Sequence, residues 1–476
     1  MMCKAFVIGM LVLLASCVSA QPTTPDTLWT QRLGSLDRND WGMDVQQAAD
    51  GGFLVLIRGD SDSNPGRVVK LTSTGQVVWE HISRHSGYDI ITYRMVATPD
   101  NGCIYVGYDI LAGTVTVKLD EDGEPVWMES FQGTRSIYFR FICLCEDGGC
   151  AVLSDTEGTD RLATILRYNS DGQLLWPSWF CYGDITPNEF TTTADGGFLI
   201  ACNRIDNNAI AAIKFSAQGD SLWTRSVINN GTLATVSALG TTLDDGFIIG
   251  GTGQTQPPQY GGFAAKLDSN AQMQWIHAGY GTSNEQPMSL VQAENGHFFV
   301  TGYCSYIPGN EWDLWVAELD SLGAPLWTWY YSQYAMDYGF IVRTVREGGC
   351  IVAGVTTHPE SGNDAFVVRL AASQPNSAPE PFHPTGYSLA QNYPNPFNAS
   401  SEIRYSIPQT EYVRLSILNI LGQEVAVLSD AIQSAGQHRV QWNGRDAMGN
   451  DLSSGIYLYR LETTSFQDIK KMILLR

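Results

Sequence analysis

The chain has 476 residues, with 49 acidic and 28 basic side chains and a formal net charge of −21. An excess of negative charge this large excludes nucleic acid and anionic membrane surfaces as binding partners. The last 91 residues hold eight acidic and eight basic side chains, so the net charge lies in the first 385 residues. We interpret this acidity as a feature that keeps the protein in solution.

The first 20 residues are typical of an export signal. Lys4 provides a positive start, residues 5–15 are apolar, and Val18-Ser19-Ala20 is a small-residue cleavage site. The apolar stretch is too short to span a membrane, so we expect no transmembrane segment in the mature chain. Leu14-Ala15-Ser16-Cys17 also fits a lipobox, and lipidation of Cys17 would make a surface lipoprotein instead. We favour cleavage after Ala20, which predicts a secreted or cell-surface protein.

A repeat of about 50 residues organises the next part of the chain. Each unit has a hairpin turn rich in Asp, Asn and Gly, residues that tolerate the positive φ of tight turns. The seven turns are Asp50-Gly51-Gly52, Asp100-Asn101-Gly102, Asp147-Gly148-Gly149, Asp195-Gly196-Gly197, Asp244-Asp245-Gly246, Glu294-Asn295-Gly296 and Glu347-Gly348-Gly349. Tryptophans keep the same spacing, at Trp29, Trp79, Trp127, Trp176, Trp223, Trp275 and Trp327.

Each unit contains four short apolar segments, which predict four strands. Strand A precedes the turn, strand B follows it, strand C ends in a basic residue and an apolar residue, and strand D carries the tryptophan. Four-stranded units packed face to face in a ring form a β-propeller. The chain opens with a lone strand D at Leu28-Trp29-Thr30 and closes with a strand C at residues 366–370. We therefore predict seven blades, with the opening strand completing the last blade and covering its free edge.

These observations divide the chain into four parts. Residues 1–20 are the signal, 26–371 the seven-bladed propeller, 372–385 a proline-rich, extended linker, and 386–476 a small all-β domain. In the last part, apolar strands alternate with Gly, Asn and Asp turns. This pattern predicts an immunoglobulin-like sandwich, so the fold class is all-β.

The C-terminal domain carries an ordered set of motifs. It starts with Asn392-Tyr393-Pro394-Asn395-Pro396-Phe397-Asn398, continues through Leu421-Gly422-Gln423-Glu424-Val425 and Trp442-Asn443-Gly444, and ends at Lys470-Lys471-Met472-Ile473-Leu474-Leu475-Arg476. This set closely resembles the type A C-terminal sorting domain of the type IX secretion system and the related Ig-like module of flagellar hook-capping proteins. The resemblance implies a bacterial protein whose partner is the type IX machinery and which is released or attached at the cell surface. An adhesive Ig-like module without a sorting role is the alternative.

The loops of the ring predict where a binding site lies. In a propeller the A–B and C–D turns share one face, and the B–C and D–A loops share the other. Loop length varies most in the B–C loops, and variable loops on a rigid scaffold are where binding residues gather. Aromatic and acidic side chains suited to sugars or peptides occur on this face. The candidates are Asp40, Trp41, Tyr88, Asp89, Tyr306, Trp312, Asp313, Asp337 and Tyr338.

One B–C loop has a pattern related to calcium loops. Asp60, Asp62 and Asn64 place oxygen ligands at every second position, and Ca²⁺ takes six to eight oxygens. The closing glutamate is absent, since the twelfth position is Leu71, and Pro65 stands where glycine is expected. We favour a solvated turn and expect no other cofactor. Cys103, Cys150 and Cys350 recur just after the hairpin turn, a position that is usually Phe, and we expect them to be buried.

No linear catalytic motif is present: the chain lacks G-x-S-x-G, H-E-x-x-H and a P-loop. The first hypothesis is a secreted or surface propeller that binds a glycan or a protein through its variable loop face. The alternative is a glycoside hydrolase or similar hydrolase, because two carboxylates from different blades leave no linear motif. The third hypothesis is a structural spacer. Whether the protein is an enzyme stays open here, with the balance against it.

Overall fold

The computed structural model describes residues 25–475 with internal gaps. The gaps are residues 35–38, 60–63, 86, 110, 132–139, 156–161, 182–184, 205–208, 229–233, 257–258, 280–284, 306–311, 333–335, 359–361, 373–386, 390–391, 393–394, 396, 399 and 434–435. The proposed signal, its cleavage site and Cys17 therefore lie outside the described residues, as does nearly all of the linker. Within the described part of the chain, no helix is long and apolar enough to cross a membrane.

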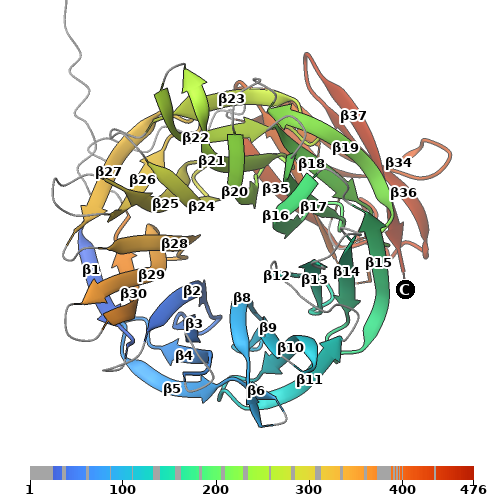
Figure 1. The fold of residues 1–476 in the computed structure, drawn as a ribbon. Coiled ribbons are helices and arrows are strands. Elements are labelled where there is room, and N and C mark those ends of the chain that lie inside the picture. Colours follow the sequence, from blue (N-terminus) through green and yellow to red (C-terminus); the bar gives the residue numbers. More distant parts are fainter. Residues whose placement is uncertain are drawn as a thin grey trace, which may run out of the picture.

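Seven four-stranded antiparallel sheets form a closed ring (Figure 1), which confirms the predicted propeller. Blades 1 to 3 consist of β2 (Asp40–Gln47), β3 (Phe53–Gly59), β4 (Arg67–Leu71) and β5 (Val77–Ile82); β8 (Ile91–Ala97), β9 (Cys103–Asp109), β10 (Gly113–Leu119) and β11 (Pro125–Phe131); and β12 (Arg140–Leu144), β13 (Cys150–Asp155), β14 (Leu162–Tyr168) and β15 (Leu174–Cys181). A short hairpin, β6 (Arg84–His85) with β7 (Tyr88–Asp89), lies between blades 1 and 2.

The other four blades repeat the same order of strands. They consist of β16 (Ile185–Thr192), β17 (Phe198–Arg204), β18 (Ile210–Phe215) and β19 (Ser221–Ile228); β20 (Ala234–Thr241), β21 (Phe247–Gln256), β22 (Gln259–Leu267) and β23 (Met273–Ala278); β24 (Gln286–Gln292), β25 (Phe298–Cys304), β26 (Asp313–Leu319) and β27 (Pro325–Tyr331); and β28 (Asp337–Thr344), β29 (Cys350–His358), β30 (Gly362–Leu370) and β1 (Thr27–Arg32). The first strand of each blade lines the centre of the ring (Figure 1).

The ring is closed by strands from both ends of the propeller sequence. β1 pairs antiparallel with β30, with Trp29 opposite Arg369 and Thr30 opposite Val368. The amide of Ala371 also donates to the carbonyl of Asp26, 2.9 Å away. The opening strand therefore supplies the missing fourth strand of blade 7, as the two complementary fragments predicted.

In blades 1, 2, 5 and 7 the repeated tryptophan locks the blade to the next one. The indole Nε1 of Trp79 donates to the carbonyl of Glu121 in the C–D turn of blade 2, 2.8 Å away. Gly123 in that turn has a φ of 84°, and a Cβ there would lie 2.8 Å from the Trp79 ring. A glycine is therefore needed both for the turn and for the close approach of the indole. Equivalent bonds join Trp29 to Ser73, Trp127 to Ser170, and Trp275 to Ser321.

In blades 1 to 5 the basic residue of strand C binds the acidic residue of the hairpin turn in its own blade. Lys70 contacts Asp50 at 2.9 Å, and Lys118 contacts Asp100 at 2.9 Å. The lysine stem crosses the last glycine of the turn: a Cβ on Gly52 would lie 3.1 Å from Cε of Lys70. The repeat therefore couples three residues, namely the acid, the glycine and the base.

Blade 6 reverses this arrangement, and it corrects one predicted turn. Gly296 has a φ of 86° and its amide donates to Ala293, as that of Gly51 donates to Ala48. The turn is therefore Asn295-Gly296-His297, one residue later than the predicted Glu294-Asn295-Gly296. His297 takes the glycine position and Glu318 the base position, and their Nδ1 and Oε1 atoms are 2.7 Å apart.

The closure of the ring explains why blade 6 has an acid, Glu318, at the position where other blades have a base. Blade 7 has no C–D turn, because its fourth strand comes from the other end of the propeller sequence. The indole of Trp327 in blade 6 therefore finds no turn carbonyl, and its Nε1 donates to Oε2 of Glu318 in its own blade, 2.5 Å away. An acid at the base position satisfies this buried donor.

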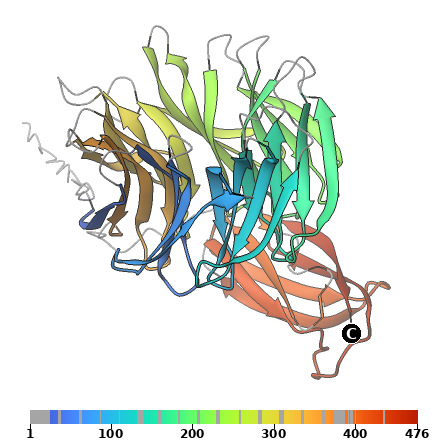
Figure 2. The same ribbon diagram turned by 60° about the horizontal axis from the view of Figure 1, so that its bottom comes forward.

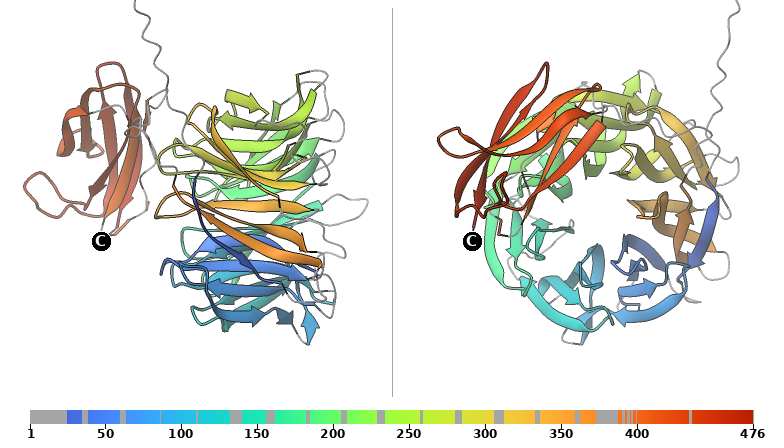
Figure 3. Two further views of the ribbon diagram at one scale, coloured as in Figure 1. Left: turned by 90° about the vertical axis from the view of Figure 1, so that its left-hand side faces the viewer. Right: turned by 180° about the vertical axis from the view of Figure 1, so that it is seen from behind.

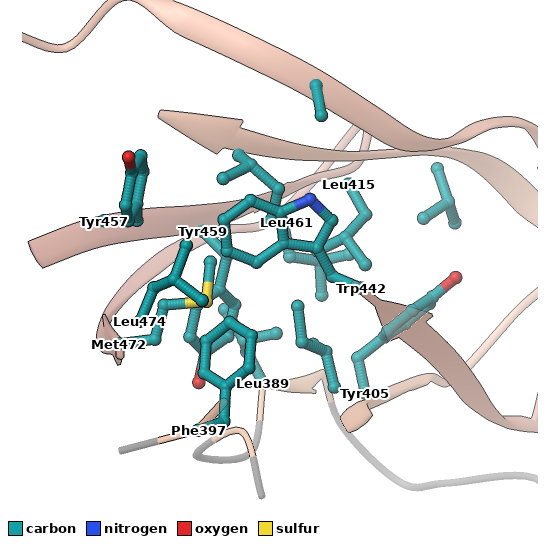
Figure 4. Close-up of a cluster of buried hydrophobic side chains, with 14 of the residues drawn as sticks. Leu389, Phe397, Tyr405, Leu415, Trp442, Tyr457, Tyr459, Leu461, Met472 and Leu474 are labelled. Carbon is teal, nitrogen blue, oxygen red and sulfur yellow. The ribbon is translucent and has the colours of Figure 1, made fainter. Parts of the chain in front are cut away.

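The C-terminal domain is a two-sheet sandwich. One sheet contains β31 (Ser388–Leu389), β32 (Ser401–Ile407) and β35 (Gly436–Trp442); the other contains β34 (Glu424–Gln433), β33 (Glu411–Leu418), β36 (Gly455–Glu462) and β37 (Gln467–Leu474). Trp442, Tyr459 and Met472 are among the residues buried between the sheets (Figure 4).

The opening motif of this domain is bound to its last strand. Phe397 is 2% exposed, its amide donates to Ile473, and its carbonyl accepts from Leu475. The amide of Ile473 donates to the side-chain oxygen of Asn395, 2.8 Å away. The motif residues and the chain end, which carried the resemblance to a sorting domain, thus form one structural unit.

Candidate functional site

We call the side of the ring formed by the B–C and D–A connections the loop face, and the opposite side the turn face. β30 ends at the turn face, so the chain leaves the propeller there. Figures 2 and 3 show the sandwich on that side of the ring. The loop face is therefore the side that the C-terminal domain leaves open.

Three aromatic side chains meet at the loop ends of blades 6 and 7. The ring of Tyr303 in β25 lies edge-to-face with Tyr338 in β28 at 4.6 Å between centroids, and with Trp312 at 5.1 Å. All three side chains are partly exposed. The backbone supports this aromatic cluster, because the amide of Asp337 donates to the carbonyl of Trp312, 3.0 Å away. Trp312 and Tyr338 are predicted site residues, whereas Tyr303 was not singled out in the sequence.

The two predicted acids beside the aromatic cluster are inside the blades. Asp313 and Asp337 are both 0% exposed. Oδ1 of Asp337 accepts a hydrogen bond from Oγ1 of Thr356 at 2.5 Å. Both carboxylates are buried and that of Asp337 joins β28 to β29, so the surface of the aromatic cluster is formed by rings.

In blade 1 the predicted acid is part of an ion pair. Asp40 is 0% exposed, and its two oxygens accept from the guanidinium of Arg67 at 2.8 and 3.0 Å. Asn64 is also buried, and its Nδ2 donates to Asn39 and to Asp40. Trp41 is half-buried beside this pair. Because Asp60 and Asp62 lie outside the described residues, the calcium loop stays a prediction.

The other predicted residues are spread around the ring. Asp89 accepts from Nε of Arg84 at 2.9 Å across the β6–β7 hairpin. His85 in the same hairpin meets the buried carboxylate of Asp109 at 3.0 Å. Tyr88 pairs with His85 through the strand ladder, and Tyr306 lies outside the described residues. The structure therefore brings together Trp312, Asp337 and Tyr338 of blades 6 and 7, but not the described candidates of blades 1 and 2.

The central channel holds charged side chains that sequence analysis missed. Asp44, Arg94 and Glu189 occupy equivalent positions on β2, β8 and β16, each just after a β-bulge. Arg343 on β28 joins them two residues further along its strand. A cavity of about 340 Å³ lies among these groups. A bulge shifts the alternation of a strand, so no simple periodicity marks these residues as neighbours.

A second cavity lies on the turn face. It has a volume of about 480 Å³ and is bounded by residues of β2, β25, β26 and β28 and of the hairpin turns that follow β24 and β28, including Glu318, Arg343 and Arg346. Ala372, where the chain leaves the ring, also borders it. Among the described residues, no group of three or more His, Cys, Asp or Glu side chains is arranged to hold a metal ion.

The fold and this geometry define a class: a seven-bladed β-propeller with an appended Ig-like sandwich. Residues 398–466 match the family model of the FlgD Ig-like domain, so the C-terminal sandwich is of that type. No curated protein matches the chain.

Solved structures with similar architecture are distant. PorZ, described as an essential surface component of the type IX secretion system of Porphyromonas gingivalis, is 11% identical, with a TM-score of 0.42 over 90% of this chain and 58% of PorZ. This chain thus spans little more than half the length of PorZ. A fungal alcohol oxidase of the AA5 family is 10% identical, with a TM-score of 0.46 over 95% of this chain and 100% of the oxidase. A gluconolactonase from Xanthomonas campestris is 12% identical, with a TM-score of 0.35 over 61% of this chain and 94% of the enzyme. At these identities and scores the similarities carry no activity to this protein.

Proposed function

We propose that this protein is a secreted or cell-surface binding protein whose propeller recognises a glycan at the aromatic cluster of Tyr303, Trp312 and Tyr338. The observation that carries the proposal is the contact of three partly exposed rings at 4.6 and 5.1 Å on the variable face. Aromatic faces supply apolar area for the C–H faces of sugar rings, and their polar edges accept or donate hydrogen bonds.

The state of the carboxylates supports binding over hydrolysis. A glycoside hydrolase needs two carboxyl groups that flank the substrate, about 5 to 9.5 Å apart. On the described loop face, Asp313 and Asp337 are fully buried, and Asp40 is held by Arg67. Acids that are buried or held in an ion pair favour a ligand held by aromatic rings rather than one cleaved by an acid and a base.

A glycan array probed with the full mature chain tests this proposal, followed by calorimetry with the best ligand. Trp312→Ala and Tyr338→Ala should each weaken binding about tenfold or more, since a buried aromatic contact contributes about 1.5–3 kcal/mol. Trp179→Ala is the matched control, because Trp179 is an exposed tryptophan on the outer strand β15. Equal loss in all three variants, or binding only to a protein ligand, would contradict glycan recognition at the aromatic cluster.

For the C-terminal domain we propose a role in export through the type IX secretion system. This proposal rests on the resemblance of its motifs, supported by the way the opening motif is fastened to the last strand. A fluorescent protein carrying an export signal and residues 386–476 should reach the outer surface in a bacterium that has this system. The same fusion without residues 470–476 should remain in the periplasm. Equal surface delivery of both, or delivery in a strain lacking the system, would refute the sorting role.

A further inference from the structure

Four charged side chains from four blades converge in the central channel. Nη2 of Arg343 lies 3.3 Å from Oδ1 of Asp44, and Nη2 of Arg94 lies 3.7 Å from Oε1 of Glu189. Both guanidiniums and the Asp44 carboxylate act electrostatically on Glu189, so all four groups share one region of the channel.

The two acids of this group differ in how they are held. Asp44 is 1% exposed, and its oxygens accept from the amides of Val45 and Met95 at 2.9 and 3.2 Å and from Gln46 at 3.3 Å. The bond to Met95 joins blade 1 to blade 2, so Asp44 has a structural role. Glu189 meets Arg94 only at 3.7 Å, which is beyond hydrogen-bond distance.

The two arginines have capacity to bind a further anion. Arg343 contacts Asp44 at 3.3 Å and the carbonyl of Val342 at 3.4 Å; Arg94 contacts the carbonyl of Tyr93 at 3.2 Å. A guanidinium has five N–H donors, and its strong bonds to carboxylates are about 2.7–2.9 Å long. Both side chains are partly open to the channel, at 29% and 21% exposure.

The surroundings add an apolar wall to this charged site. The cavity of about 340 Å³ is also bordered by apolar residues of several blades: Val96, Phe141, Phe190, Leu239, Leu290 and Ile341. A cavity of this size, in which a few charged groups converge beside apolar side chains, is typical of small-molecule sites.

We propose that the channel binds a small monocarboxylate with an apolar body, its carboxylate lying between Arg94 and Arg343. The ligand's apolar part would rest against the wall of the cavity. Glu189, beside the same guanidiniums, would be protonated when the ligand is bound, because two carboxylates at one site repel each other. This channel site is separate from the aromatic cluster on the loop face and does not depend on it.

The ionisation of Glu189 supports a pH dependence. Burial raises the pKa of Glu189 to about 7, and the opposing effect of Arg94 and Arg343 does not cancel this rise. Of the described groups around it, β2 brings Asp44, β8 brings Arg94 and β28 brings Arg343. β12 adds the thiol of Cys143, whose pKa is also raised by burial, while the cavity residues of β20 and β24 are uncharged. Anion affinity should therefore be highest below pH 7 and fall as Glu189 ionises above it.

Calorimetry on the full chain with sodium benzoate tests the proposal, with benzyl alcohol as the uncharged analogue and inorganic phosphate as a different anion. Benzoate should bind at pH 6. At pH 8 its binding should be accompanied by uptake of a proton, and above pH 7 its affinity should fall by up to about tenfold per pH unit. Arg94→Gln and Arg343→Gln should each weaken it about tenfold or more. Glu189→Gln should keep the affinity of pH 6 and remove the pH dependence.

The controls separate this site from the rest of the molecule. Trp312→Ala should leave benzoate binding unchanged, and Arg225→Gln on the outer strand β19 is the matched arginine control. If an arginine variant does not fold, the pH dependence of benzoate affinity in Glu189→Gln still tests the proposal. No saturable benzoate binding at pH 6, equal binding of benzyl alcohol, tighter binding of phosphate, or an unchanged pH profile in Glu189→Gln would each overturn the proposal.

Discussion

The contact between His297 and Glu318 in blade 6 allows a sharp test of how the repeat is held together. Glu318 is 1% exposed, its Oε1 meets His297 at 2.7 Å and its Oε2 accepts from Trp327 at 2.5 Å. Glu318→Lys would install the residue common at this position but leave its ammonium buried without a carboxylate and facing the histidine. Breaking a buried pair in this way costs about 3–5 kcal/mol. We expect a clear fall in the thermal midpoint of the propeller.

The same reasoning predicts a rescue. Adding Asn295→Asp and His297→Gly to Glu318→Lys rebuilds the acid, glycine and base of a standard blade. The triple variant should recover most of the loss and fall short by about 1 kcal/mol, because the indole of Trp327 would still lack its acceptor. Thermal unfolding followed by tryptophan fluorescence measures both steps. A single variant as stable as the parent, or a triple variant no better than the single, would refute this account of the repeat.

Three further predictions follow from burial and charge. Phe397→Ala should cost the sandwich about 3–5 kcal/mol in denaturant unfolding, whereas the exposed Tyr412→Ala should change it little; equal effects would contradict the packing. The pKa values of Asp50 and Asp147 are lowered: burial opposes ionisation, but the Lys or Arg partner and backbone amides outweigh it. The stability that these two carboxylates contribute should be complete above about pH 4 and should fall as the pH drops below it. A thermal unfolding midpoint that rises in acid would count against these pairs. Cys103 is fully buried and burial raises its pKa, so the native protein should not react there with a thiol reagent until it unfolds; rapid native labelling would disprove its core position.

Much of the architecture was predictable because its signals are local or periodic. Hairpin turns need residues that accept positive φ, so each repeat shows its turn, and Gly51 and Asn101 have φ values of 85° and 65°. The unmatched strands at residues 28–30 and 366–370 predicted the closure, which the pairing of Trp29 with Arg369 confirms. Cys103, Cys150 and Cys350 are each 0% exposed, as their place in a Phe position predicted.

Other features depend on geometry that a linear pattern does not carry. The turn of blade 6 was predicted one residue early because Gly296 was aligned with the last glycine of the other turns. The hydrogen bonds show that Gly296 is equivalent to Gly51, the middle residue of the turn in blade 1. The channel group was missed because bulges after Gly42, Thr92 and Pro187 set which residues come next to the axis. Two of the three rings in the aromatic cluster, Trp312 and Tyr338, were candidates from the sequence. Tyr303 lies at the end of β25 in the same blade as Trp312, and it contacts Tyr338 of blade 7 only because the two blades pack together.

The two faces of the ring carry different constraints, and this difference explains how the loop face can change. The tryptophan lock between blades and the acid–base pair within a blade both lie on the turn face, where Trp79 covers Gly123 and Lys70 holds Asp50. A substitution there would strain a turn or leave a charge unpaired, so these residues resist change. The B–C and D–A connections take no part in these two contacts. The length and side chains of these connections can therefore vary without opening the ring. This freedom lets a propeller acquire a binding site beside Trp312 while it keeps its fold.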